Sequence, residues 1–202
     1  MTSLFHANPF SIFRPRHPVK IEGNDPQAIQ KLKEAVTDVL RAHLQEGQTL
    51  VTLCIGTDRS TGDALGPIIG TALCKRIPDI PLYGTLDEPV HAVNLQEKLK
   101  EIADNNLNPF VLAIDASLGR LDSVGKIDVG PGSLHPGAGV NKSLPRVGDM
   151  YISGIVNVGG FLEYFVLQNT RLSIVMTLAE VITEGLHGVL SLSTQKEKAG
   201  VN

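Results

Sequence analysis

The sequence predicts an α/β protein with a three-layer α/β/α architecture, in which helices cover both faces of a central, mainly parallel sheet. Two observations carry this prediction. Short, continuous apolar segments at 48–56 and 109–117 are typical of strands that are covered on both faces. Helical segments alternate with strand-like segments along the chain, which is the order that a parallel sheet with crossover helices requires.

The first half of the chain is predicted to hold two helices and two strands. In chain order these are a helix at 25–44, a strand at 48–56, a helix at 63–77 and a short strand at 79–84. Asp25 is expected to cap the first helix, with Pro26 at its first position. Pro67 falls within the first turn of the second helix, where a proline is tolerated.

The second half continues the alternation. Its predicted elements are a helix at 90–105, strands at 109–117, 124–130 and 150–158, and helices at 160–168 and 171–192. A long loop rich in Gly and Pro joins the last two strands. We expect an irregular N-terminal arm at 1–24, a single domain at 25–195 and a polar tail at 196–202.

The composition excludes several classes of protein. A formal net charge of -3 argues against a dedicated nucleic-acid surface. No continuous apolar run approaches the ~18 residues of a membrane span, and the first 20 residues lack the apolar segment of a signal peptide. Cys54 and Cys74 form no metal-binding or redox pattern. We therefore expect a cytoplasmic protein with two reduced thiols and no membrane partner.

The segment "CIGTDRSTGDALGP", residues 54–67, begins like a phosphate-binding loop but places Asp63 where such a loop needs a lysine. A carboxylate at the start of a helix competes with a phosphate for the same amide groups and repels it. The dinucleotide fingerprint is also absent. Ser60 is not centred in the G-x-S-x-G turn of a serine hydrolase. The loop is therefore predicted to serve another chemistry.

Asp63 and Asp115 are the candidate catalytic residues. Asp63 could simply cap a helix, whereas Asp115 follows a central apolar strand, where a carboxylate needs partners or a function. If the two strands are neighbours, the aspartates meet at the carboxyl edge of the sheet. Two close carboxylates acquire different pKa values, so one can act as an acid and the other as a base. Alternatively, they could hold a divalent cation.

The loop between the last two strands supplies the candidate substrate-binding residues. Long loops inside a compact domain are usually functional, and His135 is a candidate ligand or acid–base group there. Gly137 and Gly139 would let backbone amides approach a substrate, and Lys142 could bind a carboxylate.

Three segments, "IGTDRSTGDALGP", "LAIDASLG" and "GSLHPGAGVNKSLPRVGDMYISGIVN", resemble the sporulation protein YyaC family in the same order. The segments "DALGP", "AIDA" and "HPGAGV" also resemble the germination protease of spore-forming bacteria. The wider resemblance includes the hydrogenase maturation endopeptidases, which have a phosphorylase/hydrolase-like fold. These likenesses imply a spore protease that acts on a protein or peptide, such as small acid-soluble spore proteins, in the cytoplasm of the forespore or spore.

By the same resemblance, the proposed catalytic aspartates of the germination protease correspond to Asp63 and Asp115. In the maturation endopeptidases two acids and a histidine surround a metal, and these correspond to Asp63, Asp115 and His135. Two alternatives stay open, namely a metal-dependent peptidase and a binding protein without catalysis. The apolar C-terminal helix could pack in the core or in a homo-oligomer.

Overall fold

The computed structural model describes residues 18–136 and 144–199, with side chains as far as Ser191. Its centre is a six-stranded sheet with the order β1-β5-β6-β4-β2-β3. The strands are β1 Val19–Glu22, β2 Thr49–Cys54, β3 Leu82–Tyr83, β4 Pro109–Gly119, β5 Lys126–Pro131 and β6 Met150–Val158. The helices are α1 Ala28–His43, α2 Leu65–Arg76, α3 Leu95–Asn105, α4 Glu163–Gln168 and α5 Leu172–Ala199, with short 3₁₀ turns η1 Gly62–Ala64 and η2 Leu121–Ser123.

The sheet is mainly parallel, as the sequence predicts. β3, β2, β4 and β6 run parallel to one another, while β5 is antiparallel to β6 and β1 is antiparallel to β5. The parallel strands β2 and β4 are mostly apolar and lie in the interior of the sheet, where most of their side chains are buried. The α/β class is therefore confirmed.

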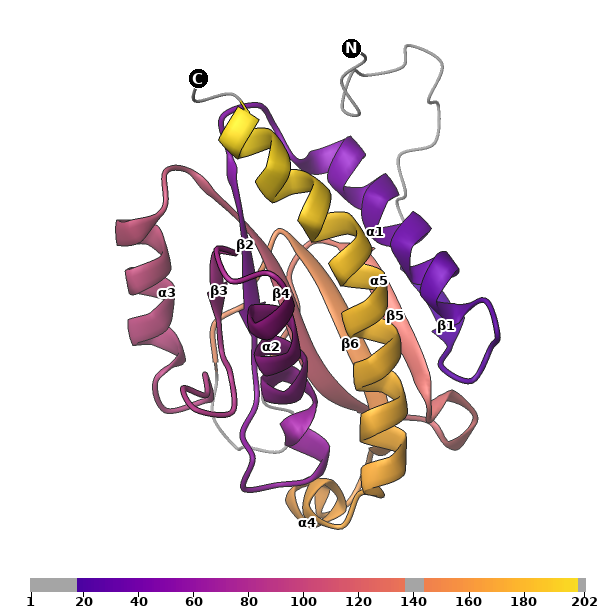
Figure 1. Ribbon diagram of the computed structural model, residues 1–202. Coiled ribbons are helices and arrows are strands. Elements are labelled where there is room, and N and C mark those ends of the chain that lie inside the picture. Colours follow the sequence, from indigo (N-terminus) through magenta and orange to yellow (C-terminus); the bar gives the residue numbers. More distant parts are fainter. Residues whose placement is uncertain (1–17, 137–143, 200–202) are drawn as a thin grey trace.

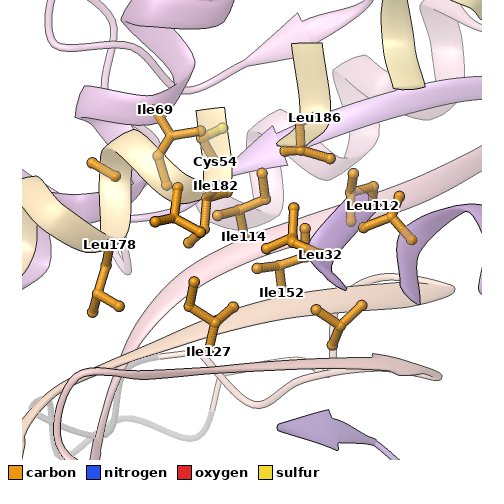
Figure 2. Packing of buried hydrophobic residues seen from close by; sticks show 14 of the residues in the cluster. Leu32, Cys54, Ile69, Leu112, Ile114, Ile127, Ile152, Leu178, Ile182 and Leu186 are labelled. Carbon is orange, nitrogen blue, oxygen red and sulfur yellow. The ribbon is translucent and has the colours of Figure 1, made fainter. Parts of the chain in front are cut away.

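One face of the sheet carries the larger core. Helices α1, α2 and α5 cover this face (Figure 1), and the amphipathic helix α1 buries its apolar side against it. Side chains from the helices interdigitate with Cys54, Leu112, Ile114, Ile127 and Ile152 of the strands (Figure 2). Burial of this continuous apolar cluster is the main term that stabilises the fold.

The opposite face is covered only in part. A second apolar cluster joins α3, through Leu95 and Ile102, to Val51 and Leu53 of β2. Beyond β4 the residues on this face become polar, for example Asp128 of β5 and Ser153 of β6, which pair directly across the strands. The prediction of helices on both faces therefore holds for the parallel half of the sheet, and the antiparallel half keeps one solvated face, as such sheets commonly do.

The termini of the domain differ from the prediction. Within the expected arm, residues 19–22 form the edge strand β1, which pairs with β5. Asp25 does accept a hydrogen bond from the Gln27 amide, but Pro26 precedes α1 instead of occupying its first position. Helix α5 runs to Ala199 and so includes the start of the expected polar tail.

Helix α5 is the longest element of the protein. By length and composition, one segment within the described residues, Leu172–Ser191, could cross a membrane, with a mean hydropathy of 1.3. Half of that segment is buried inside the protein, where α5 packs along α1 and α2. Packing of this kind is equally expected of an apolar core helix.

Candidate functional site

The topology places a crevice at the carboxyl edge of the sheet between β2 and β4. The chain leaves β2 toward its edge-side neighbour β3, and it leaves β4 toward β5 on the other side of the sheet. Connections that diverge in this way leave a gap outside the strand ends, which is where open α/β sheets bind ligands. The ladder between β2 and β4 ends at Cys54 and Ile114, so Asp115 is the first residue of β4 beyond it.

Glycine shapes the loop that follows β2. Gly56 has a φ of +145°, and its amide donates a hydrogen bond to the Val90 carbonyl oxygen at 2.8 Å. A methyl group at Gly56 would overlap the carbonyl oxygen of Asp63, which itself accepts a hydrogen bond from the Thr57 amide at 3.1 Å. The absent side chain therefore lets the loop fold back onto the turn that carries Asp63.

Asp63 lies in η1, immediately before α2, and is partly buried. Burial raises the pKa of its carboxyl above the ordinary value, because the charged form loses hydration. The Ser60 hydroxyl lies beside this carboxyl and opposes the rise. Ser60 Oγ is buried and forms no hydrogen bond of normal geometry within the described residues. The Ser60 hydroxyl and the Asp63 carboxyl are therefore close without forming a well-aligned hydrogen bond. Asp63 is not the N-cap residue of either helix, because Thr61 holds that position in η1 and Ala64 holds it in α2.

Asp115 lies within β4, which continues four residues further to Gly119, and not at the end of the strand as predicted. Its position is fixed by pairing with Ser153 of β6. Only 8% of Asp115 is exposed, and its Oδ1 accepts a hydrogen bond from the Ala116 amide at 2.9 Å. Strand pairing therefore fixes the backbone of Asp115, and the amide of the next residue in β4 binds its buried side chain.

A cavity of about 260 Å³ brings the two aspartates together. Its other lining residues come from four segments that are distant in sequence: Ile55, Gly56, Thr57, Arg59 and Ser60; His91, Ala92 and Val93; Pro136 and Leu144; and Tyr164. A larger hollow of about 410 Å³ lies along β3 and α3, but neither Asp63 nor Asp115 lines it. The smaller cavity, which both aspartates line, is the candidate active site.

His91 lines this cavity but was not among the predicted site residues, and the same is true of Arg59 and Tyr164. It lies in the turn before α3, where Asn94 Oδ1 accepts a hydrogen bond from the His91 amide at 2.8 Å. The Val93 amide donates to His91 Nδ1 at 3.3 Å. In a neutral ring with this arrangement the proton is on Nε2, which is then a donor. In the sequence, His91 is only a histidine before a predicted helix, and this position does not indicate that it shares a cavity with Asp63 and Asp115.

Of the four predicted substrate-binding residues, the structure describes only His135. His135 is exposed and does not line the cavity, although its neighbour Pro136 does. Gly137, Gly139 and Lys142 lie outside the described residues. Their roles stay predictions.

A metal site formed by Asp63, Asp115 and His135 is not supported by the described residues. Among them, no group of three or more His, Cys, Asp and Glu side chains is arranged to hold a metal ion. The imidazole that shares the cavity with the aspartates is that of His91, whose Nδ1 already accepts a backbone hydrogen bond. The donor set that the resemblance implies for a divalent cation is therefore incomplete in this part of the chain.

Comparison with known proteins gives a family without an assigned activity. A family model described as a protein of unknown function (DUF1256) matches residues 20–185, which include both aspartates and His91. The uncharacterized protein YyaC of Bacillus subtilis (strain 168) is 49% identical over 178 residues, covering 87% of this chain and 86% of that protein. The chain therefore belongs to the YyaC (DUF1256) family.

Proposed function

We propose that this protein is an endopeptidase that hydrolyses a peptide bond by acid–base catalysis between Asp63 and Asp115. The observation that carries the proposal is that both aspartates line one cavity at the carboxyl edge of the sheet, where burial also raises the pKa of Asp63. The resemblance to the germination protease at "DALGP" and "AIDA" supports the same pair. On that resemblance, the substrates are small acid-soluble proteins in the cytoplasm of the developing or germinating spore.

The raised pKa of Asp63 suggests how the two roles divide. A carboxyl with a raised pKa keeps its proton to higher pH and is suited to act as the general acid, which is Asp63 here. Asp115 is the base that takes a proton from water, whose oxygen then forms a bond to the carbonyl carbon. Asp63 gives its proton to the departing nitrogen as the C–N bond breaks. The proton on Asp115 returns to solvent and Asp63 is reprotonated, which closes the cycle.

His91 supplies the group that was expected from His135. With its proton on Nε2, the ring can donate a hydrogen bond to the carbonyl oxygen as negative charge develops there. The fixed turn between His91 and Asn94 holds the backbone of this residue before substrate arrives. This role needs no change in the charge of the imidazole during the reaction.

The experiment is cleavage of purified small acid-soluble spore proteins by the purified chain, followed by gel electrophoresis and mass spectrometry. Asp63→Asn and Asp115→Asn should each lower the rate by about 10²–10⁴-fold, which is the usual contribution of acid–base assistance. Asp58→Asn is the matched control, because Asp58 is exposed in the same loop and does not line the cavity. Cleavage that survives in both cavity variants would refute the assignment.

Two further measurements separate the alternatives. A chelator such as EDTA should leave the rate unchanged, and a rate restored only by an added divalent cation would favour a metal-dependent peptidase. Absence of cleavage, together with a stable complex between the wild-type chain and the spore protein, would favour a binding protein of the same fold.

A further inference from the structure

Exposed apolar side chains gather at α4 and the first turns of α5. These are Phe161, Leu162, Tyr164, Phe165, Leu172 and Met176, and Phe161 is 86% exposed. Four of them lie within the five consecutive residues 161–165, at the end of the sheet where β6 leads into α4 (Figure 1). Single exposed apolar residues need no explanation, but a contiguous aromatic patch commonly marks an interaction surface.

The helix that carries this patch is firmly anchored. Leu167, the one buried residue of α4, packs against Gly62 of η1, the turn that also holds Asp63. Asn157 of β6 donates hydrogen bonds to the Val166 carbonyl oxygen at 3.3 Å and to Thr170 Oγ1 at 3.2 Å. The apolar side chains are therefore presented on a fixed support.

The backbone directs part of the patch outward. Leu162 has a φ of 55° and a ψ of 45°, the left-handed conformation that a branched side chain rarely adopts. Leu162 and its neighbours Phe161 and Phe165 line a shallow hollow of about 570 Å³. Strained residues of this kind are found at ligand-binding sites more often than elsewhere.

The patch is continuous with the candidate active site. Tyr164 lines the cavity that holds Asp63 and Asp115, and its ring makes an edge-to-face contact with Phe165, with centroids 6.0 Å apart. Phe165 in turn lines the hollow. Gln168 Nε2 donates a hydrogen bond to the Tyr164 hydroxyl at 2.9 Å, which helps to hold the ring between the two depressions.

We propose that this patch binds an apolar side chain of the polypeptide substrate, a few residues from the bond in the cavity. The inference rests on the proposed peptidase function. A segment of polypeptide can occupy the cavity and the hollow at once, because Tyr164 borders the first and contacts a wall of the second. A second copy of the chain seated permanently on the patch would cover Tyr164 and hinder access to the cavity, which favours a substrate segment as the occupant.

The test measures binding separately from cleavage. The protein is the Asp63→Asn variant, in which the patch is unchanged, and the probes are fluorescein-labelled dodecapeptides of Gly, Ser and Thr with one Phe at successive positions. We expect binding by fluorescence anisotropy to depend on the Phe. Phe161→Ser and Phe165→Ser should each weaken it by roughly tenfold, as loss of an aromatic anchor does. The matched control is Leu107→Ser, because Leu107 is 82% exposed but precedes β4 at the opposite edge of the sheet.

Three results would overturn the proposal. They are equal affinities for peptides with and without Phe, undiminished affinity in both Phe variants, and no binding by the Asp63→Asn or wild-type protein up to about 1 mM peptide. Sedimentation velocity then tests the other occupant, since a wild-type dimer that Phe161→Ser dissociates would assign the patch to a second copy. Failure of the peptidase function appears instead as absence of cleavage by the wild-type chain, and failure of the aspartate assignment as cleavage that persists in both aspartate variants, whatever the peptide affinities.

Discussion

Replacement of Gly56 by alanine tests how the loop positions Asp63. A methyl group here would overlap the Asp63 carbonyl oxygen and lie 2.9 Å from Pro67 Cδ. Neither atom is at the end of a flexible side chain. The φ of +145° at Gly56 adds a conformational cost for any residue with a Cβ atom.

The expected loss of stability follows from these two effects. A sparsely populated φ such as +145° costs an L-residue about 1–3 kcal/mol. Overpacking against fixed groups costs about 1–3 kcal/mol more, so the free energy of unfolding should fall by roughly 2–6 kcal/mol. For a domain of this size each kcal/mol corresponds to about 2–4 °C, so the midpoint of thermal unfolding should fall by roughly 4–24 °C.

The measurement is urea unfolding followed by circular dichroism, with Gly47→Ala as the matched control. Gly47 also has a positive φ, +81°, but a methyl group there would meet nothing within 4 Å. Its replacement should cost about 1 kcal/mol, because the φ penalty is partly offset by the lower entropy of the unfolded chain. If Gly56→Ala were no more destabilising than Gly47→Ala, the close contact between Gly56 and Asp63 would not constrain the loop as argued.

Three further changes give distinct outcomes. Asp63→Asn should stabilise the protein at neutral pH and not at pH 3, which urea unfolding at the two pH values would show; equal effects at both would contradict it. His91→Ala should lower kcat for cleavage by about 10²–10³-fold, the loss typical of an oxyanion donor, with little change in KM, whereas an unchanged kcat would remove His91 from the mechanism. Leu162→Gly should raise the free energy of unfolding by up to about 1 kcal/mol, because glycine adopts the left-handed conformation without strain. The gain is limited because glycine also has more conformational entropy in the unfolded chain. A loss of stability would show that the Leu162 side chain makes a needed contact.

The strand β2 could be predicted because burial on both faces leaves a continuous apolar run, and it lies within the predicted 48–56. β6 also has the predicted bounds, Met150–Val158, although one of its faces is partly polar. The edge strand β1 escaped prediction because only Ile21 of its four residues is buried. Its stability comes from pairing with β5, more than 100 residues away, which leaves no local signal.

The end of α5 was missed for a different reason. The segment 193–199 is polar, which suggested a tail, but it is rich in Gln, Lys, Glu and Ala, and these residues have high helix propensity. A helix already begun in the core extends through such residues without needing an apolar face of its own. Polarity alone therefore did not distinguish a solvated helix from an irregular tail.

The candidate site was predicted where sequence position determines spatial position. Asp63 and Asp115 follow the apolar cores of β2 and β4, and adjacent parallel strands bring such residues to the same edge. His91 enters the cavity through a turn whose geometry depends on Asn94 and on the bridge between Ile55 and Val90. No residue spacing within the sequence encodes that bridge, so His91 could be placed only from the structure.

The pH dependence expected for Asp63 bears on why such a residue would be kept. Because the folded protein raises the pKa of this carboxyl, the folded state binds a proton more tightly than the unfolded chain. Stability from this group is thus fully present below the unfolded pKa near 3.8 and falls as the pH rises through the folded pKa. At neutral pH the ionised carboxyl lowers the free energy of unfolding, by ~1.4 kcal/mol for each tenfold difference in proton affinity between the folded and unfolded states. Solvent that reaches this partly buried group makes the loss smaller. A residue kept only to cap α2 would lie at the N-cap position and bond a helix amide through its side chain. That position is held by Ala64, and no side-chain cap hydrogen bond forms there. Coincident loss of cleavage and gain of neutral-pH stability in Asp63→Asn would therefore identify Asp63 as an acid retained for chemistry at the expense of the fold.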